Sequence, residues 1–211
     1  RTQMQLDLGA KVSLVGYLSM TVTAGTVASS VLADRIVRRL GVARVTVISV
    51  LMTAGALLGF ALSPGVEGLF LCALPMGLAA GAADVALNNF VALHYEAKHM
   101  SWLHCFWGVG TIVSPYIMSY ALLHSTWTNG YRTVSCLQFA IAAVILVTLP
   151  LWKVNKQTET ESGETALLGI KGAFKIKGVP YLLLGFLAYC AAEATTMLWA
   201  SSYLEGTRGI S

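Results

Sequence analysis

Six long apolar stretches dominate the sequence, each separated from the next by charged or turn-forming residues. They cover approximately residues 12–33, 45–63, 68–92, 102–124, 132–152 and 179–204. About 20 consecutive apolar residues are enough to cross the hydrocarbon core of a bilayer as a helix. The chain is 56% hydrophobic and 11% charged, which excludes an ordinary soluble domain, where about a quarter of the residues are charged. The sequence therefore predicts an all-α, multi-pass membrane protein with six transmembrane helices.

The basic residues are distributed unevenly between the two sides of the membrane. Of the 14 Lys and Arg residues, only Arg1, Lys11, Arg132 and Arg208 lie on one side. The other ten lie in the connections between the first and second, third and fourth, and fifth and sixth stretches, so the positive-inside rule predicts that these connections are cytoplasmic in the plasma membrane. Because the basic residues are spread between apolar stretches, the net charge of +4 indicates topology rather than nucleic-acid binding.

This orientation predicts that the chain is a fragment of a longer protein. Both ends lie outside the cell, and the first span is not preceded by any segment that would carry the N-terminus across. We expect one further helix before Lys11 and more helices after Ser211. The predicted parts are an incomplete helical bundle at 1–152, a polar cytoplasmic linker with a short interfacial helix at 153–178, and the first helix of a second bundle at 179–211.

An acidic residue, Asp84, lies inside the third apolar stretch. Ionisable side chains in a bilayer usually face a cavity or the interior of the bundle. Gly77, Gly81, Asp84 and Asn88 are spaced by four, three and four residues, which places them on one helix face. The glycines permit close approach of another backbone. The carboxylate and the amide of Asn88, with Asn89 beside it, predict a site for a polyol and a proton, or else a structural hydrogen bond to another helix.

The sixth apolar stretch contains a second acid, Glu193. Tyr189, Glu193 and Thr196 fall on one helical stripe, and Trp199 lies next to it. An acid flanked by aromatic rings and hydroxyls is typical of a sugar-binding wall. The alternative is that Trp199 anchors the helix at the membrane interface.

Two further patterns concern the fourth stretch and the cysteines. Gly108 and Gly110, followed by Pro115, indicate a helix that bends as part of a gate or packs tightly. The four cysteines are Cys72, Cys105, Cys136 and Cys190. They contain no CxxC pair and are expected to be small apolar side chains buried in helix packing, so no metal site is predicted.

The connection between the first two stretches, SSVLADRIVRRLGVARV, resembles the signature loop of the major facilitator superfamily. The residues that carry the resemblance are Leu32, Ala33, Asp34, Arg35, Arg38 and Arg39, whereas Ser30 and Val37 replace two usual glycines. Asp34 and the arginines can form charge-assisted pairs that latch one state of a transporter. Alternatively, the segment only sets the topology.

Within that superfamily, DVALNNFVALHY and LHCFWGVGTIVSPYI resemble the fucose permease and related sugar–proton symporters. The resemblance implies that the six spans are family helices two to seven, about half of a twelve-helix protein. It also implies a role in solute and proton handling for Asp84, which replaces a glutamate of the permease.

The predicted function is proton-coupled uptake of a sugar or similar small polar solute by alternating access. No cofactor is expected besides the proton or another coupling cation, and the expected partners are the solute, the lipid bilayer and the missing helices. A drug–proton antiporter is the first alternative. A membrane enzyme or a non-transporting sensor is disfavoured, because no cluster of acid, base and nucleophile is present at one depth.

Overall fold

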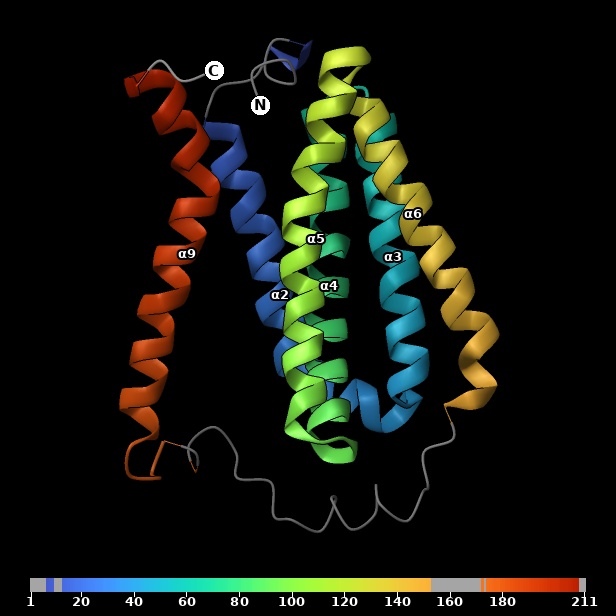
Figure 1. Cartoon of the computed structure of the whole chain (residues 1–211), viewed down its shortest axis with the longest axis vertical. Helices are drawn as coiled ribbons and strands as arrows, with labels where there is room; N and C mark the ends of the chain where they lie inside the picture. The colour runs from blue at the N-terminus through green and yellow to red at the C-terminus, as the bar shows by residue number, and fades with distance from the viewer. Residues whose placement is uncertain (1–6, 10–12, 153–171, 173, 209–211) are drawn as a thin grey trace. The chain divides into compact units, whose positions relative to one another are not determined.

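The computed structural model describes residues 7–9, 13–152, 172 and 174–208. Within these residues, six helices are long and apolar enough to cross a bilayer (Figure 1). They are α2 (Ser13–Leu40), α3 (Val42–Leu62), α4 (Val66–His94), α5 (Ala97–His124), α6 (Trp127–Thr148) and α9 (Val179–Arg208). A short 3₁₀ turn, η1 (Leu149–Leu151), follows α6. The predicted all-helical membrane fold with six spans is confirmed.

A single residue, Gly41, joins the first two helices, which corrects the predicted loop. Helix α2 continues through the basic segment to Leu40, and α3 starts at Val42. Gly41 has a φ of 80°, a left-handed conformation that glycine adopts readily. Its N–H donates to the carbonyl oxygen of Val37 at 2.7 Å, which closes the last turn of α2. Asp34 and the arginines that follow it therefore lie on a helix rather than in a loop.

Helix α6 ends before the end of the predicted fifth span. The turn η1 begins directly after Thr148, the last α-helical residue, and Pro150 is the second residue of that turn. Proline has no N–H to donate and clashes with the carbonyl group four residues earlier, so it disfavours continuation of an α-helix. The chain turns here, and the ring of Trp152 stacks on that of Phe90 with centroids 5.7 Å apart.

Residues 1–153 form one compact unit, and residues 154–211 form another. In the first unit α4 makes the most extensive contacts, against α2, α3 and α5, while α6 packs against α3 and α5. Consecutive helices of this unit, from α2 to α6, run in alternating directions (Figure 1). The α2–α3 and α4–α5 connections therefore lie at the same end, which we call the basic end because it carries Arg38, Arg39, Arg44 and Lys98. The α3–α4 and α5–α6 connections lie at the opposite end.

Helices α2 and α4 approach closely along three glycines, Gly25, Gly77 and Gly81, which we call the glycine seam. A Cβ atom on Gly77 would clash with the carbonyl oxygen of Val22, and a Cβ atom on Gly81 would clash with that of Thr26. The hydroxyl of Thr26 also donates to the carbonyl oxygen of Gly77 at 3.2 Å. Small residues of this kind let backbones meet where no hydrophobic effect drives helices together. The prediction that Gly77 and Gly81 permit close approach is confirmed.

Two hydrogen bonds join α3 to α6. The hydroxyl of Ser135, which is fully buried, donates to the carbonyl oxygen of Ala54 at 2.8 Å. The hydroxyl of Thr53 donates to Oε1 of Gln138 at 2.7 Å. Interhelical hydrogen bonds between polar side chains are a recurrent element of helix association in membranes.

The opposite end of the bundle holds an apolar core of Leu57, Phe60, Leu69 and Ala73. Leu8, from the short described segment before α2, packs against this core. Its neighbour Asp7 accepts a hydrogen bond from the indole N–H of Trp127 at 2.8 Å, and the Trp127 side chain is buried. Residues 7–9 are thereby attached to the start of α6.

The second unit contains α9, and its side chains are mostly exposed within that unit. The predicted interfacial helix of the linker falls largely on residues outside the described part of the chain, including Leu167, Leu168 and Ile170. Of the apolar residues assigned to that helix, Phe174 and Ile176 are described, and both are exposed in turns before α9.

Candidate solute and proton site

Asp84 and Asn88 lie one turn apart on α4. Asp84 is the 19th of the 29 residues of that helix, so it lies well inside the span. The amide nitrogen of Asn88 donates to the backbone carbonyl oxygen of Asp84 at 2.9 Å and to its Oδ1 at 2.8 Å. The Asp84 side chain is exposed and Asn88 is half-buried. Within the described residues, the carboxylate makes no hydrogen bond to another helix.

The predicted stripe on α4 divides into a packing part and a polar part. Gly77 and Gly81 are buried in the glycine seam against α2. Further along the stripe, Asp84 is exposed and Asn88 is half-buried, while Asn89, beside the stripe, is exposed. The helix therefore packs against α2 through small residues, and among the described residues it leaves the acid exposed.

The acid of α9 also has a donor one turn away on its own helix. Tyr189 precedes Glu193 by four residues, so the two side chains lie on the same face of the helix. Glu193 is half-buried, whereas Tyr189 and Trp199 are exposed. The hydroxyl of Thr196 donates to the carbonyl oxygen of Ala192 at 2.9 Å. These residues belong to the second unit and are described by themselves.

The acidic and basic residues at the end of α2 include one ion pair. Arg38 pairs with Asp34, four residues earlier on the same helix, and both side chains are about half exposed. Arg35 and Arg39 are exposed. In this structure the pair connects two turns of α2, and the predicted latch between parts of the transporter remains a hypothesis.

The glycines of α5 do not pack closely against the described residues. A Cβ atom on Gly108 or Gly110 would meet no other atom within 4 Å. The hydroxyls of Thr111 and Ser114 donate to the carbonyl oxygens of these two glycines at 2.7 and 2.9 Å, next to Pro115 inside the helix. The gating interpretation remains a hypothesis.

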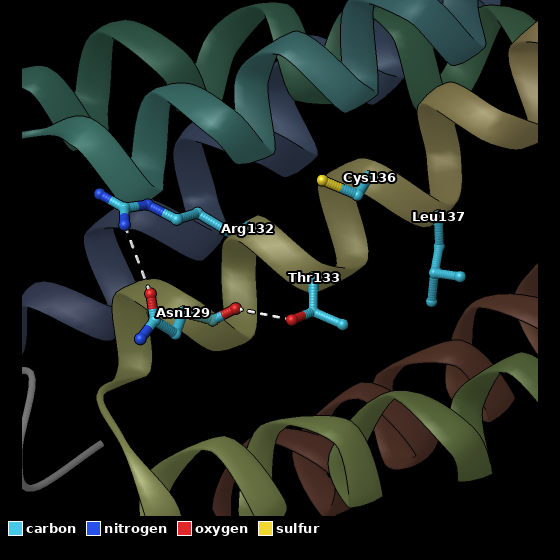
Figure 2. Close-up of a pocket in the computed structure, with 5 residues that line it drawn as sticks. All are labelled: Asn129, Arg132, Thr133, Cys136 and Leu137. Carbon is cyan, nitrogen blue, oxygen red and sulfur yellow. Dashed lines mark hydrogen bonds between the residues drawn. The ribbon is translucent and has the colours of Figure 1, made fainter.

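Sequence reasoning missed an open hollow of about 440 Å³ beside α6, near the opposite end. Figure 2 shows its five lining residues, all from α6: Asn129, Arg132, Thr133, Cys136 and Leu137. Arg132 donates to Oδ1 of Asn129 at 3.4 Å, and Thr133 donates to the backbone oxygen of Asn129 at 2.9 Å. The sequence signal that could have revealed this hollow is the spacing of these residues by three or four positions, which places them on one face of the helix. The hollow includes none of the residues predicted to bind solute.

The cysteines are all free thiols, but they are not all buried. Cys72 and Cys190 are half-buried, whereas Cys105 and Cys136 are exposed. The expectation that all four are buried is wrong for Cys105 and Cys136, because no described helix covers the faces of α5 and α6 on which they lie. In the described part of the chain, no group of three or more His, Cys, Asp or Glu residues is placed to hold a metal ion.

Comparison with known proteins decides the family. The model of the Major Facilitator Superfamily matches residues 2–211, nearly the whole chain. The chain belongs to the major facilitator superfamily. No curated protein and no solved structure matches it. As a major facilitator it is an integral multi-pass membrane protein and a secondary transporter of small solutes, and proteins of this superfamily are transporters rather than enzymes.

The match confirms the superfamily that the segment around Asp34 suggested. In this major facilitator the segment forms the last turns of α2, and Gly41 provides the tight connection to α3.

Proposed function

We propose that this major facilitator is a proton-coupled importer of a sugar or a similar small polar solute that works by alternating access. The observation that carries the proposal is the pair of Asp84 and Asn88 inside α4, with the carboxylate exposed and bonded only to its own helix among the described residues. A carboxylate in a bilayer-spanning helix is costly, and such acids commonly serve as proton or substrate sites.

The chemistry of the pair favours a neutral polar solute. A carboxylate and an amide together supply the acceptors and donors that hydroxyl groups need. On α9, the acid Glu193 with the ring of Tyr189 offers a similar combination, and an aromatic face suits the C–H surface of a sugar. The resemblance of the segment around Asp84 to sugar–proton symporters of the fucose permease type agrees with this chemistry.

The sidedness and the transport cycle follow from the charges. The basic end, with Arg38, Arg39 and Arg44, faces the cytoplasm of a plasma-membrane protein according to the positive-inside rule. We propose that Asp84 takes up a proton together with the solute from outside and releases it inside, which resets the carrier.

The test uses the full-length protein in proteoliposomes with an acidic exterior and a panel of radiolabelled hexoses, including D-glucose, D-galactose and L-fucose. Asp84→Asn should abolish uphill accumulation but retain exchange of labelled for unlabelled hexose in the absence of a gradient. Glu67→Gln is the matched control, because it removes an acid from the first turn of the same helix. Unchanged uphill accumulation by Asp84→Asn would refute the proposal. Proton-driven expulsion of a cationic dye without hexose uptake would instead identify a drug–proton antiporter.

A further inference from the structure

The open hollow beside α6 changes its lining from polar to apolar along the helix. Asn129, Arg132 and Thr133 lie toward the start of α6, and Cys136 and Leu137 lie one turn further on (Figure 2). At about 1.5 Å per residue, Arg132 lies about 8 Å and Leu137 about 15 Å from the first residue of the helix. The hollow is therefore polar near the opposite end of the bundle and apolar deeper in the bilayer.

Arg132 is an exposed cation without an acidic partner among the described residues. The ion pairs in that part of the chain both lie at the basic end. The guanidinium donates to Oδ1 of Asn129 at 3.4 Å, which leaves other N–H groups of its five for a ligand. Asp7, the acid attached to the start of α6, accepts the indole N–H of Trp127 instead. An unpaired charge within a membrane-spanning helix is costly, so an anion bound to Arg132 would stabilise it.

The polar end of the hollow suits a phosphate group in particular. The N–H groups of arginine form a planar fork that binds two phosphate oxygens at once. Asn129 donates one amide N–H to the hydroxyl of Ser125 and has a second N–H to offer. The hydroxyl of Thr133 donates to the backbone oxygen of Asn129, so its own oxygen can accept from a hydroxyl group of the ligand. None of the five lining residues is acidic, so the ammonium of a zwitterionic headgroup would find no counter-charge among them.

We propose that this hollow binds one phospholipid with a net negative headgroup. The phosphate contacts Arg132 and Asn129, and the upper part of an acyl chain lies on Cys136 and Leu137. This order matches the bilayer, in which the polar headgroups lie outside the hydrocarbon core. The volume of about 440 Å³ lies within the range of roughly 300–1,000 Å³ that is usual for small-molecule sites. A soluble phosphate would use only the polar half of the hollow.

The test is native mass spectrometry of the detergent-solubilised full-length protein with phosphatidylglycerol, or with phosphatidylcholine of the same acyl chains. Wild type should bind phosphatidylglycerol more tightly. Arg132→Gln should lower that affinity about fivefold, which corresponds to about 1 kcal/mol for one arginine near an anionic lipid surface. Arg132→Lys keeps the charge and should retain most of the affinity. Arg39→Gln is the matched control, because it removes an exposed arginine from the basic end, and it should keep the wild-type preference.

Asn129→Asp tests the hollow with the arginine still in place. A carboxylate at this position would pair with Arg132 and repel a phosphate, so the preference for phosphatidylglycerol should be lost while the Tm remains that of wild type.

The thiol of Cys136 reports where the lipid binds. Phosphatidylglycerol should slow its alkylation by N-ethylmaleimide in wild type but not in Arg132→Gln. Alkylation of Cys105, an exposed thiol on α5, should proceed at the same rate with both lipids.

Three results would overturn the proposal. Equal losses of affinity in Arg132→Gln and Arg39→Gln would mean that anionic lipid binds through the general positive charge of the protein. Displacement of phosphatidylglycerol by sn-glycerol 3-phosphate, which has no acyl chain, would identify a site for a soluble phosphate. A wild-type dimer that Arg132→Gln dissociates would identify a second copy of the chain as the occupant. None of these measurements involves transport, so their failure would leave the proposed function standing.

Discussion

The glycine seam between α2 and α4 is the feature whose perturbation can be predicted most directly. In Gly77→Ala, the added methyl group would clash with the carbonyl oxygen of Val22 and lie 2.9 and 3.0 Å from its carbonyl carbon and Cα atom. All three atoms belong to the backbone, so no side-chain rotation relieves the contact. The two helices must move apart, which also lengthens the 3.2 Å hydrogen bond from Thr26 to Gly77.

The size of the effect follows from three contributions. Overpacking of a close contact costs about 1–3 kcal/mol, and the weakened interhelical hydrogen bond adds roughly 0.6 kcal/mol. Alanine has a helix propensity that offsets up to about 1 kcal/mol of this loss. We therefore expect Gly77→Ala to lower the free energy of unfolding by about 0.6–3.6 kcal/mol. At roughly 2–4 °C per kcal/mol for a chain of this size, the Tm should fall by about 1–14 °C.

The assay is thermal unfolding of the detergent-solubilised protein, followed by intrinsic tryptophan fluorescence. Gly55→Ala is the matched control, because a methyl group on Gly55 would meet no atom within 4 Å. It keeps the gain in helix propensity without the clash, so its Tm should equal or exceed that of wild type. Equal Tm values for the two variants would refute the reasoning that the seam depends on the absence of a Cβ atom.

Two further stability effects are expected, one from a buried and one from a part-buried hydrogen bond. Ser135→Ala removes the fully buried donor to the carbonyl oxygen of Ala54, and should lower the free energy of unfolding in the same assay by about 1 kcal/mol. Trp127→Phe keeps an aromatic ring but leaves Asp7 without its indole donor, and should cost about 1–3 kcal/mol, because hydrogen bonds to charged groups are the stronger ones. Since this variant removes a reporter tryptophan, its unfolding is better followed by loss of the monodisperse peak in size-exclusion chromatography after heating.

Exposed residues of the same types serve as the controls for these two variants. The hydroxyl of Ser114 is exposed and bonds only to its own helix, so Ser114→Ala should leave the Tm nearly unchanged. The side chain of Trp102 is 60% exposed, against 6% for Trp127, so Trp102→Phe should also have little effect. Losses of equal size at the buried side chains and at their exposed controls would contradict the assignment of stability to the hydrogen bonds of Ser135 and Trp127.

The sequence predicted the spans because span length depends on local composition. The end of α2 was not predicted, because the arginines after Asp34 have the composition of a loop while the chain there remains helical until Gly41. Arginine is a good helix former, and at a membrane surface the helix can continue into water without cost to the arginine side chains. The helix ends where the backbone conformation changes, at Gly41 with its positive φ, and hydropathy does not predict such a change.

Some contacts between helices were also predictable from the sequence, and others were not. The close approach at Gly77 and Gly81 was predictable, since small residues at helical spacing have few other uses inside a membrane. The bond from Ser135 to Ala54 joins residues 81 positions apart, and the bond from Trp127 to Asp7 joins residues 120 positions apart. The sequence does not show which residue accepts the hydrogen bond of Ser135, because the acceptor is a backbone carbonyl group and every residue has one.

Each of the two acids inside the spans has a polar side chain one turn away on its own helix, and the sequence spacing predicted this placement. Asn88 follows Asp84 by four residues, and Tyr189 precedes Glu193 by four, so both donors lie one helical turn from their acid. Such a pair moves with its helix as a single body. In a transporter that rearranges its helices between two states, a carboxylate bonded to another helix would lose its partner during the change. A carboxylate bonded to its own helix keeps its partner during the change. We therefore expect the Asp84–Asn88 bond to persist in both access states of the unprotonated carrier. A structure of the opposite access state in which the amide nitrogen of Asn88 lies beyond hydrogen-bond distance of Oδ1 of Asp84 would contradict this expectation.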